Sequence, residues 1–183
     1  MPASLHNVFG QRQSFVELLG TLLFGLGVPL ALTLLEPAAF HALPLWRSAG
    51  ALLLVLDIAA GCAANFTHST NDYYAARPRH RWVFIGLHFH LVGVALLLGD
   101  ELAFASAIWA YTIAGAALLN LMKSNPLQTF AGGLLLAIGL VGMPYVMESS
   151  VLMRVVSTLF MLKVLFGFAV DHYGAVRPSA TPA

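Results

Sequence analysis

The chain has 183 residues, of which 59% are hydrophobic and 9% are charged, and its formal net charge is +1. Soluble domains carry about 25% charged residues, so this chain lacks the surface of a water-soluble protein, and lipid is its expected solvent. A transmembrane helix takes about 20 apolar residues, so the length allows six spans with short loops and no separate soluble domain. We therefore expect an all-α, polytopic integral membrane protein, a compact bundle of six transmembrane helices.

The chain begins with a polar segment, residues 1–14, which we expect to be cytoplasmic. The apolar run at 15–35 is too long for the core of a signal peptide, so it is predicted to be retained as the first span. The connector between Glu36 and Trp46 contains two prolines. It is predicted to lie at the membrane interface rather than to cross the bilayer.

Five further apolar runs complete a predicted transmembrane domain at 15–173, and residues 174–183 are expected to form a flexible cytoplasmic tail. The approximate limits of these spans are 48–68, 82–99, 102–122, 127–147 and 151–170. In the fourth span, alanines recur every three or four residues, which places them on one helix face and predicts a close helix–helix seam. These alanines are Ala103, Ala107, Ala110, Ala114 and Ala117.

The basic residues predict the orientation of the bundle. With six spans, both termini and the loops after spans two and four lie on one side, which carries Arg12, Arg77, Arg79, Arg81, Lys123 and Arg177. The opposite side carries Glu36, Asp100, Glu101 and Glu148, with Arg47 and Arg154 as its basic residues. Because cytoplasmic loops are enriched in Lys and Arg, we expect cytoplasmic termini and a location in the bacterial inner membrane.

Two charged residues, Asp57 and Lys163, lie deep inside predicted spans, with His90 at a similar depth. A charge at this depth is costly unless it has a partner or water, so the three side chains are expected to meet if spans two, three and six are neighbours. One interpretation is a solvated polar site for transport, in which Asn65 continues the polar face of span two towards the cytoplasm. The alternatives are a purely structural Asp57–Lys163 ion pair and a lack of contact.

Span three contains His88 and His90, which a regular helix would point to opposite sides. We therefore expect that the pair does not chelate one metal ion. His90 is predicted to face the bundle interior, and His88 is predicted to face another helix or the lipid interface.

A second polar group is predicted at the cytoplasmic mouth, formed by His68, Asp72, Asp171 and His172. Histidine with carboxylate suits a divalent metal or a proton relay, and the candidate metal ligands are His68, Asp72 and His172. The alternative is a purely structural role, in which these residues form an ordinary polar cap on the helix ends. The leading expectation is that the protein has no cofactor. The alternatives are a divalent metal ion at these residues, or a haem bound by His68 and His172.

Three arginines, Arg77, Arg79 and Arg81, occupy the loop after span two and the start of span three. They could hold an anionic substrate or lipid headgroups, although the positive-inside rule already accounts for them. The lone cysteine, Cys62, excludes an internal disulfide and is expected to be a small packing residue.

Hydrolase, metalloprotease and nucleotide-binding motifs are absent from the sequence. The segment Asn71-Asp72-Tyr73-Tyr74 resembles the opening of the aspartate-rich motif of UbiA-type prenyltransferases. The further aspartates of that motif are missing, since Ala75 and Ala76 follow, and the chain is too short for that fold. The activity of that family is therefore not expected here.

The leading hypothesis is a small membrane transporter or channel for a solute, an ion or a proton, rather than an enzyme. The alternatives are a histidine-using membrane enzyme or redox protein, and an accessory subunit of a larger membrane complex. The expected partners are membrane lipids, with a homo-oligomer or a larger complex as further alternatives, and no nucleic acid.

Overall fold

The computed structural model of the protein describes residues 13–174, and within them every regular element is helical. Six helical segments are long and apolar enough to cross a membrane, which confirms the predicted polytopic membrane class. The predicted terminal segments 1–14 and 174–183, with Arg12 and Arg177, lie almost wholly outside the described residues. The six segments are α2 (Phe15–Leu35), α4 (Leu45–Ala64), α6 with α7 (Pro78–Leu87 and His90–Leu98), α8 (Leu102–Leu121), α9 (Gln128–Val146) and α10 (Val151–Met161) with η2 (Leu162–Phe168).

Local sequence signals set several helix ends. Ser14 caps α2: its hydroxyl accepts from the Glu17 backbone N–H, while the Glu17 carboxylate accepts from the Ser14 N–H at 2.8 Å. This reciprocal capping box engages two backbone donors that a helix start leaves without partners. Glu17 therefore has a structural role at the start of the first span.

The second span ends earlier than predicted. Helix α4 stops at Ala64, and the chain turns at Thr67, whose hydroxyl caps a short helix, α5 (His68–Ala75). The connector after α2 also forms a short helix, α3 (Ala38–His41), too short to cross a bilayer.

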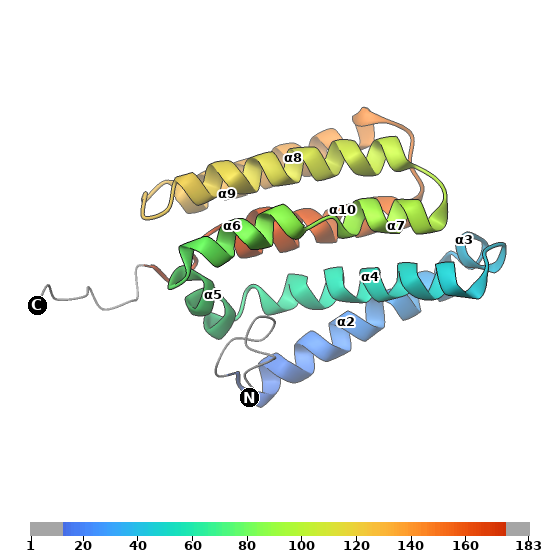
Figure 1. Cartoon of the computed structure of the whole chain (residues 1–183), viewed down its shortest axis with the longest axis horizontal. Helices are drawn as coiled ribbons and strands as arrows, with labels where there is room; N and C mark the ends of the chain where they lie inside the picture. Colours follow the sequence, from blue (N-terminus) through green and yellow to red (C-terminus); the bar gives the residue numbers. More distant parts are fainter. Residues whose placement is uncertain (1–12, 175–183) are drawn as a thin grey trace, which may run out of the picture.

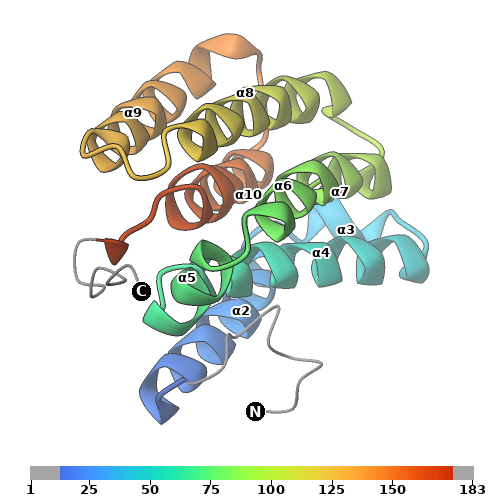
Figure 2. The same cartoon turned by 60° about the vertical axis from the view of Figure 1, so that its left-hand side comes forward.

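Span six is the central helix of the bundle. Its two pieces, α10 and η2, contact α4, α8 and α9, and Figure 2 shows α10 between α8 and α9 on one side and α4 on the other. Burial follows this position: 67% of span six is buried in the molecule, against 22% of α2. Helix α2 packs chiefly on α4, and α4 lies between α2 and α7.

The predicted alanine seam on span four is wrong. Ala103, Ala110 and Ala114 are exposed, whereas the buried face of α8 carries Ile108, Thr112 and other residues. Close packing instead depends on glycine at other contacts. A Cβ on Gly25 of α2, for example, would lie 2.8 Å from Ala60 Cβ on α4.

The start of α2 and the end of η2 lie at one end of the bundle, together with α5 and the turn between α8 and α9 (Figure 1). This end, which carries Arg77, Arg79 and Lys123, is called the basic end below. The opposite end carries the α7–α8 turn, where Gly99 adopts φ +81° and Glu101 φ 56°.

Candidate functional site

Two spans depart from regular α-helix at mid-length. Span three is interrupted at His88 and Phe89, so that α6 and α7 lie end to end, with α7 alongside α4 (Figure 1). Span six changes at Leu162 from α-helix to π-helix, which continues to Phe168. A π-helical turn is rare and frequently occurs at functional sites. Neither irregularity was predicted, because no proline lies at either position.

Neighbouring side chains bind the backbone groups at the break in span three. The Trp109 indole N–H donates to the His88 carbonyl at 2.8 Å, and His88 Nδ1 lies 2.5 Å from the Phe84 carbonyl. A carbonyl oxygen only accepts, so this contact places a proton on His88 Nδ1. The break is therefore stabilised by specific polar contacts, as bare backbone groups inside a membrane require.

At the π-helix, an ion pair links spans two and six. Lys163 Nζ lies 2.6 Å from Asp57 Oδ2 and also donates to the Asp57 backbone carbonyl at 3.2 Å. Both residues lie about 18 Å along their spans from the first residue, at about 1.5 Å per residue. Each charge thus has the partner that its depth demands.

His90, the first residue of α7, completes the cluster. Its Nδ1 lies 3.4 Å from the same Asp57 Oδ2. The structure thus brings together the three residues that the sequence grouped, which we call the mid-membrane cluster: Asp57, His90 and Lys163. They come from three spans, and two of these are irregular at this level.

Gly61 makes room for the lysine. A Cβ on Gly61 would lie 2.4 Å from Lys163 Cε and 2.8 Å from Nζ. The Lys163 side chain therefore reaches Asp57 along the side of α4 that lacks a side chain at position 61. The backbone of this lysine is held as well, because the buried Asn65 amide donates to its carbonyl at 2.9 Å.

Asn65 has a different place from the predicted one. We expected it on a polar face descending from Asp57, but α4 ends at Ala64 and the Asn65 side chain is only 5% exposed. Its amide binds a backbone carbonyl of η2, where the π-helical hydrogen bonds replace the i to i−4 bonds of an α-helix.

The mid-membrane cluster is unevenly exposed. The Lys163 side chain is 4% exposed, whereas His90 is 31% and Asp57 is 49% exposed. The carboxylate therefore opens onto the flank of the bundle, on the side of α4 that also exposes Leu53. The sequence predicted a solvated polar site, a purely structural ion pair or a lack of contact, and the structure shows an ion pair whose carboxylate is open on one side.

His88 is closer to the cluster than predicted. Because the helix is broken, the His88 and His90 rings do not point to opposite sides: their centroids are 5.1 Å apart. His88 is 5% exposed and stacks against Phe84. Even so, no group of three histidine, cysteine or carboxylate side chains within residues 13–174 is arranged to hold a metal ion.

At the basic end, Arg81 requires a correction. It was expected to face anions or lipid headgroups, but it is 1% exposed and its guanidinium donates to Asn120 Oδ1 and the Ala169 carbonyl, both at 2.8 Å. The end of a helix leaves carbonyls without intrahelical donors, and Arg81 satisfies them where η2 ends. Arg79 is exposed, and Arg77 stacks on the Tyr73 ring.

Two buried amides that the sequence analysis missed share this task. Asn71 donates to the Val170 carbonyl at 3.1 Å, and Gln128 donates to the Ala169 carbonyl at 3.2 Å. The available signal was their position beside apolar runs, where an amide has little access to water. Arg81, Asn120, Gln128 and the carbonyls of Phe168 and Ala169 form what we call the capping cluster.

The residues of the predicted cytoplasmic mouth separate into two groups. His68 Nδ1 lies 2.7 Å from Asp72 Oδ2, on exposed side chains one helical turn apart. His172 packs between the Phe66 and Phe166 rings, and its Nε2 lies 3.0 Å from the Phe166 carbonyl. The three candidate metal ligands therefore do not converge. Burial lowers the pKa of His172, and the hydrogen bond to Phe166 and the nearby Asp171 oppose that shift only in part.

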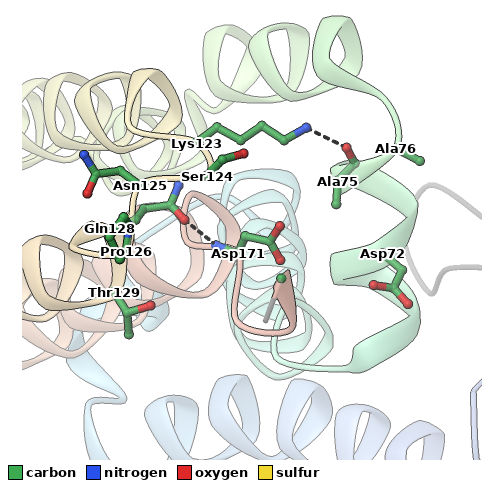
Figure 3. Close-up of a pocket in the computed structure, with 11 residues that line it drawn as sticks. Asp72, Ala75, Ala76, Lys123, Ser124, Asn125, Pro126, Gln128, Thr129 and Asp171 are labelled. Atoms are coloured by element: carbon green, nitrogen blue, oxygen red, sulfur yellow. Dashed lines mark hydrogen bonds between the residues drawn. The ribbon is translucent and has the colours of Figure 1, made fainter. Parts of the chain in front are cut away.

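Two hollows open at the basic end. The first, of about 760 Å³, lies between α5 and the α8–α9 turn, with Asp72 on one wall and Asp171 and Gln128 across from it (Figure 3). Lys123 bridges the rim by donating to the Ala75 carbonyl at 2.8 Å. The second, of about 450 Å³, also includes Asp72, together with Glu17 and His68.

These two hollows contain none of the three residues of the mid-membrane cluster.

Comparison with known protein families, with characterised proteins and with solved structures finds no match to this chain. The chemistry of the site is therefore the basis for inferring its function.

Proposed function

We propose that the protein is a small membrane transporter in which the mid-membrane cluster binds a proton, an ion or a small solute. One observation carries the proposal: an Asp–Lys ion pair and a histidine meet inside the membrane where span three is interrupted and span six is π-helical. Ionisable groups at this depth mark ion and proton pathways, and transporters form their sites at discontinuous helices.

The ion pair gives the site two competing states. A proton or cation that binds Asp57 competes with Lys163 for the same carboxylate oxygen. Once displaced, the buried ammonium needs another partner, because an unpaired charge inside the membrane is costly. Binding at Asp57 is thus coupled to movement of Lys163, which is carried by the π-helical part of span six.

His90 provides a second proton acceptor beside the carboxylate. An unperturbed histidine titrates close to physiological pH, and it can pass a proton between neighbouring groups. Its position at the first residue of α7 places this chemistry at the break in span three. Movement at the break and a change of protonation at His90 would therefore be coupled.

The orientation belongs to the same proposal. The basic end is placed in the cytoplasm of a bacterial cell, with the protein in the inner membrane, because basic residues in short loops favour the cytoplasmic side. Both hollows at the basic end would then open to the cytoplasm. Cysteine labelling of position 79 from each side of intact vesicles tests this orientation.

Flux measurements in proteoliposomes test the function. We expect Asp57→Asn and Lys163→Met each to reduce proton or solute flux at least tenfold. Asp100→Asn is the matched control, because that carboxylate lies in the turn between α7 and α8 outside the spans. The folded fraction of each variant is measured by gel filtration, and flux is expressed per folded molecule.

The double variant Asp57→Asn/Lys163→Met separates transport from a structural ion pair. If the pair only holds the bundle together, the double variant restores folding and flux together, because no charge is left unpaired. If the cluster transports, the double variant folds but does not conduct. Unchanged flux in all three variants contradicts the proposal.

A further inference from the structure

The flank of the bundle that exposes Asp57 is unusual for a surface inside a membrane. Along α4, exposed residues recur every three or four positions at Trp46, Ala49, Leu53 and Asp57. Three of these residues suit a lipid-facing helix, but a half-exposed carboxylate does not, since ionisable groups in spans face protein or water. A polar group from outside this chain is therefore expected to cover Asp57.

The carboxylate has binding capacity left. Within residues 13–174, Lys163 and His90 both approach Asp57 at Oδ2, so Oδ1 is available for a further donor. His90 Nδ1 is buried without a hydrogen bond to the described part of the chain, and a third of its side chain is exposed. Because Nδ1 faces the Asp57 carboxylate, Nε2 is the ring nitrogen that can donate outwards when it carries a proton.

A donor and an acceptor thus adjoin on one face, which makes this face complementary to itself. In a two-fold symmetric contact, the same surface of both copies meets. The His90 donor of one copy can then face the Asp57 acceptor of the other, and the reverse holds for the second pair. The Asp57–Lys163 pair carries no net charge, so two such faces approach without repulsion between like charges. Polar side chains hydrogen-bonded between helices stabilise association within a bilayer.

We propose that two copies of this chain associate through the exposed face of α4 beside α7, with His90 of each copy donating to Asp57 of the other. The contact would complete the coordination of both carboxylates and shield them from lipid. The surrounding contact is apolar, through Leu53 and its neighbours on α4. This inference stands on the exposure of the cluster and does not depend on transport.

Subunit counting tests the stoichiometry. The full-length chain, with one fluorophore at its C-terminus, is reconstituted at low density in liposomes, and photobleaching steps are counted for each spot. We expect two steps. One step per spot overturns the proposal, and so does any larger predominant number.

Cysteine cross-linking tests the face. In a Cys62→Ser background, Leu53→Cys places a thiol one helical turn from Asp57 at a position that is 65% exposed. Ile138→Cys on α9 is the matched control, 53% exposed on another span. Oxidation in native membranes is expected to link Leu53→Cys into a dimer and leave Ile138→Cys monomeric. A dimer that fails to link through position 53 overturns the proposal.

A third variant tests the contact itself. His90→Leu removes both donors of a two-fold dimer, and two membrane hydrogen bonds together correspond to about a tenfold change in dissociation constant. The fraction of two-step spots is expected to fall accordingly at matched density. An unchanged fraction overturns the assigned contact. Photobleaching steps and flux are measured separately, so a loss of dimerisation is distinguished from a loss of transport.

Discussion

The mid-membrane cluster and the capping cluster are both polar groups built around a buried cation, yet they differ in what surrounds it. At the capping cluster, Arg81 donates to the Asn120 amide oxygen and to two main-chain carbonyls. At the mid-membrane cluster, Lys163 binds a carboxylate that is itself half exposed. Main-chain oxygens are fixed in place, whereas the Asp57 carboxylate can exchange Lys163 for a proton or another cation.

The two clusters also differ in the helices that carry them. Arg81 joins the starts or ends of three spans: α6, α8 and span six. Lys163 and Asp57 meet where two spans depart from regular helix. Three changes test this difference, from the largest expected effect to the smallest.

The largest effect is expected from Arg81→Ala. It leaves the Asn120 amide and the carbonyls of Phe168 and Ala169 buried without their donor, and hydrogen bonds of charged groups are worth about 1.5–3 kcal/mol. We expect the free energy of unfolding in bicelles to fall by about 3 kcal/mol. Flux per folded molecule is expected to stay within twofold of the wild type.

The control for this change is Arg79→Ala, which removes the same type of side chain from the exposed face of the same helix. Its expected effect is below about 0.5 kcal/mol, as for most surface substitutions. Equal losses from the two variants would mean that the charge of the basic end, and not the capping of span six, stabilises the fold.

An intermediate effect is expected from Gly61→Ala. The added methyl group would overlap the end of the Lys163 side chain and force the ammonium away from Asp57. We expect flux to fall at least tenfold, with a loss of stability of about 1–2 kcal/mol, as for overpacking of a filled site.

Gly86→Ala is the matched control, since a Cβ at Gly86 meets no atom within 4 Å. It is expected to leave both flux and stability near wild-type values. If Gly61→Ala transports normally, the contact between Lys163 and Asp57 is not required for function, and the mid-membrane cluster would resemble the capping cluster.

The smallest effect concerns pH and His172. Burial lowers the pKa of His172 in the folded protein. The unfolded chain therefore binds a proton first, so stability is lost as pH falls below the ordinary histidine pKa of about 6.5 and down towards the folded value. We expect the protection of residues 166–174 against hydrogen exchange, measured relative to the unfolded chain at the same pH, to fall between pH 7 and pH 5.

His172→Phe keeps an aromatic ring between Phe66 and Phe166 and removes the titrating group. Its protection against exchange in this segment, relative to the unfolded chain, should not change over the same pH range. A pH response that persists in the variant would show that His172 is not its source.

The apolar composition and the positions of the loops were sufficient to predict the fold class. Four of the six spans begin and end within about two residues of the predicted limits, because apolar length and helix caps are local properties. The exceptions are spans two and three. Thr67 caps a new helix where a continuous span was predicted, and span three begins at Pro78 and breaks at His88.

The candidate site also has features that the sequence could predict and features that it could not. The depth of Asp57, His90 and Lys163 follows from counting residues along each span, so their meeting was predictable once the spans were taken as neighbours. The proximity of His88 to His90 was not, because it depends on a break stabilised by Trp109 from another span. Arg81 was misjudged because a surface arginine and a capping arginine have the same local sequence signal.

The sequence by itself determined the solvent of this protein, the number of its spans and the depth of its charges, since each follows from apolar length and composition along the chain. Only the tertiary structure decided which carboxylate oxygen Lys163 binds, which arginine is buried and which flank exposes Asp57. These depend on helix neighbours, on rotation about each helix axis and on two departures from α-helical geometry, and contacts between residues about a hundred positions apart fix all three.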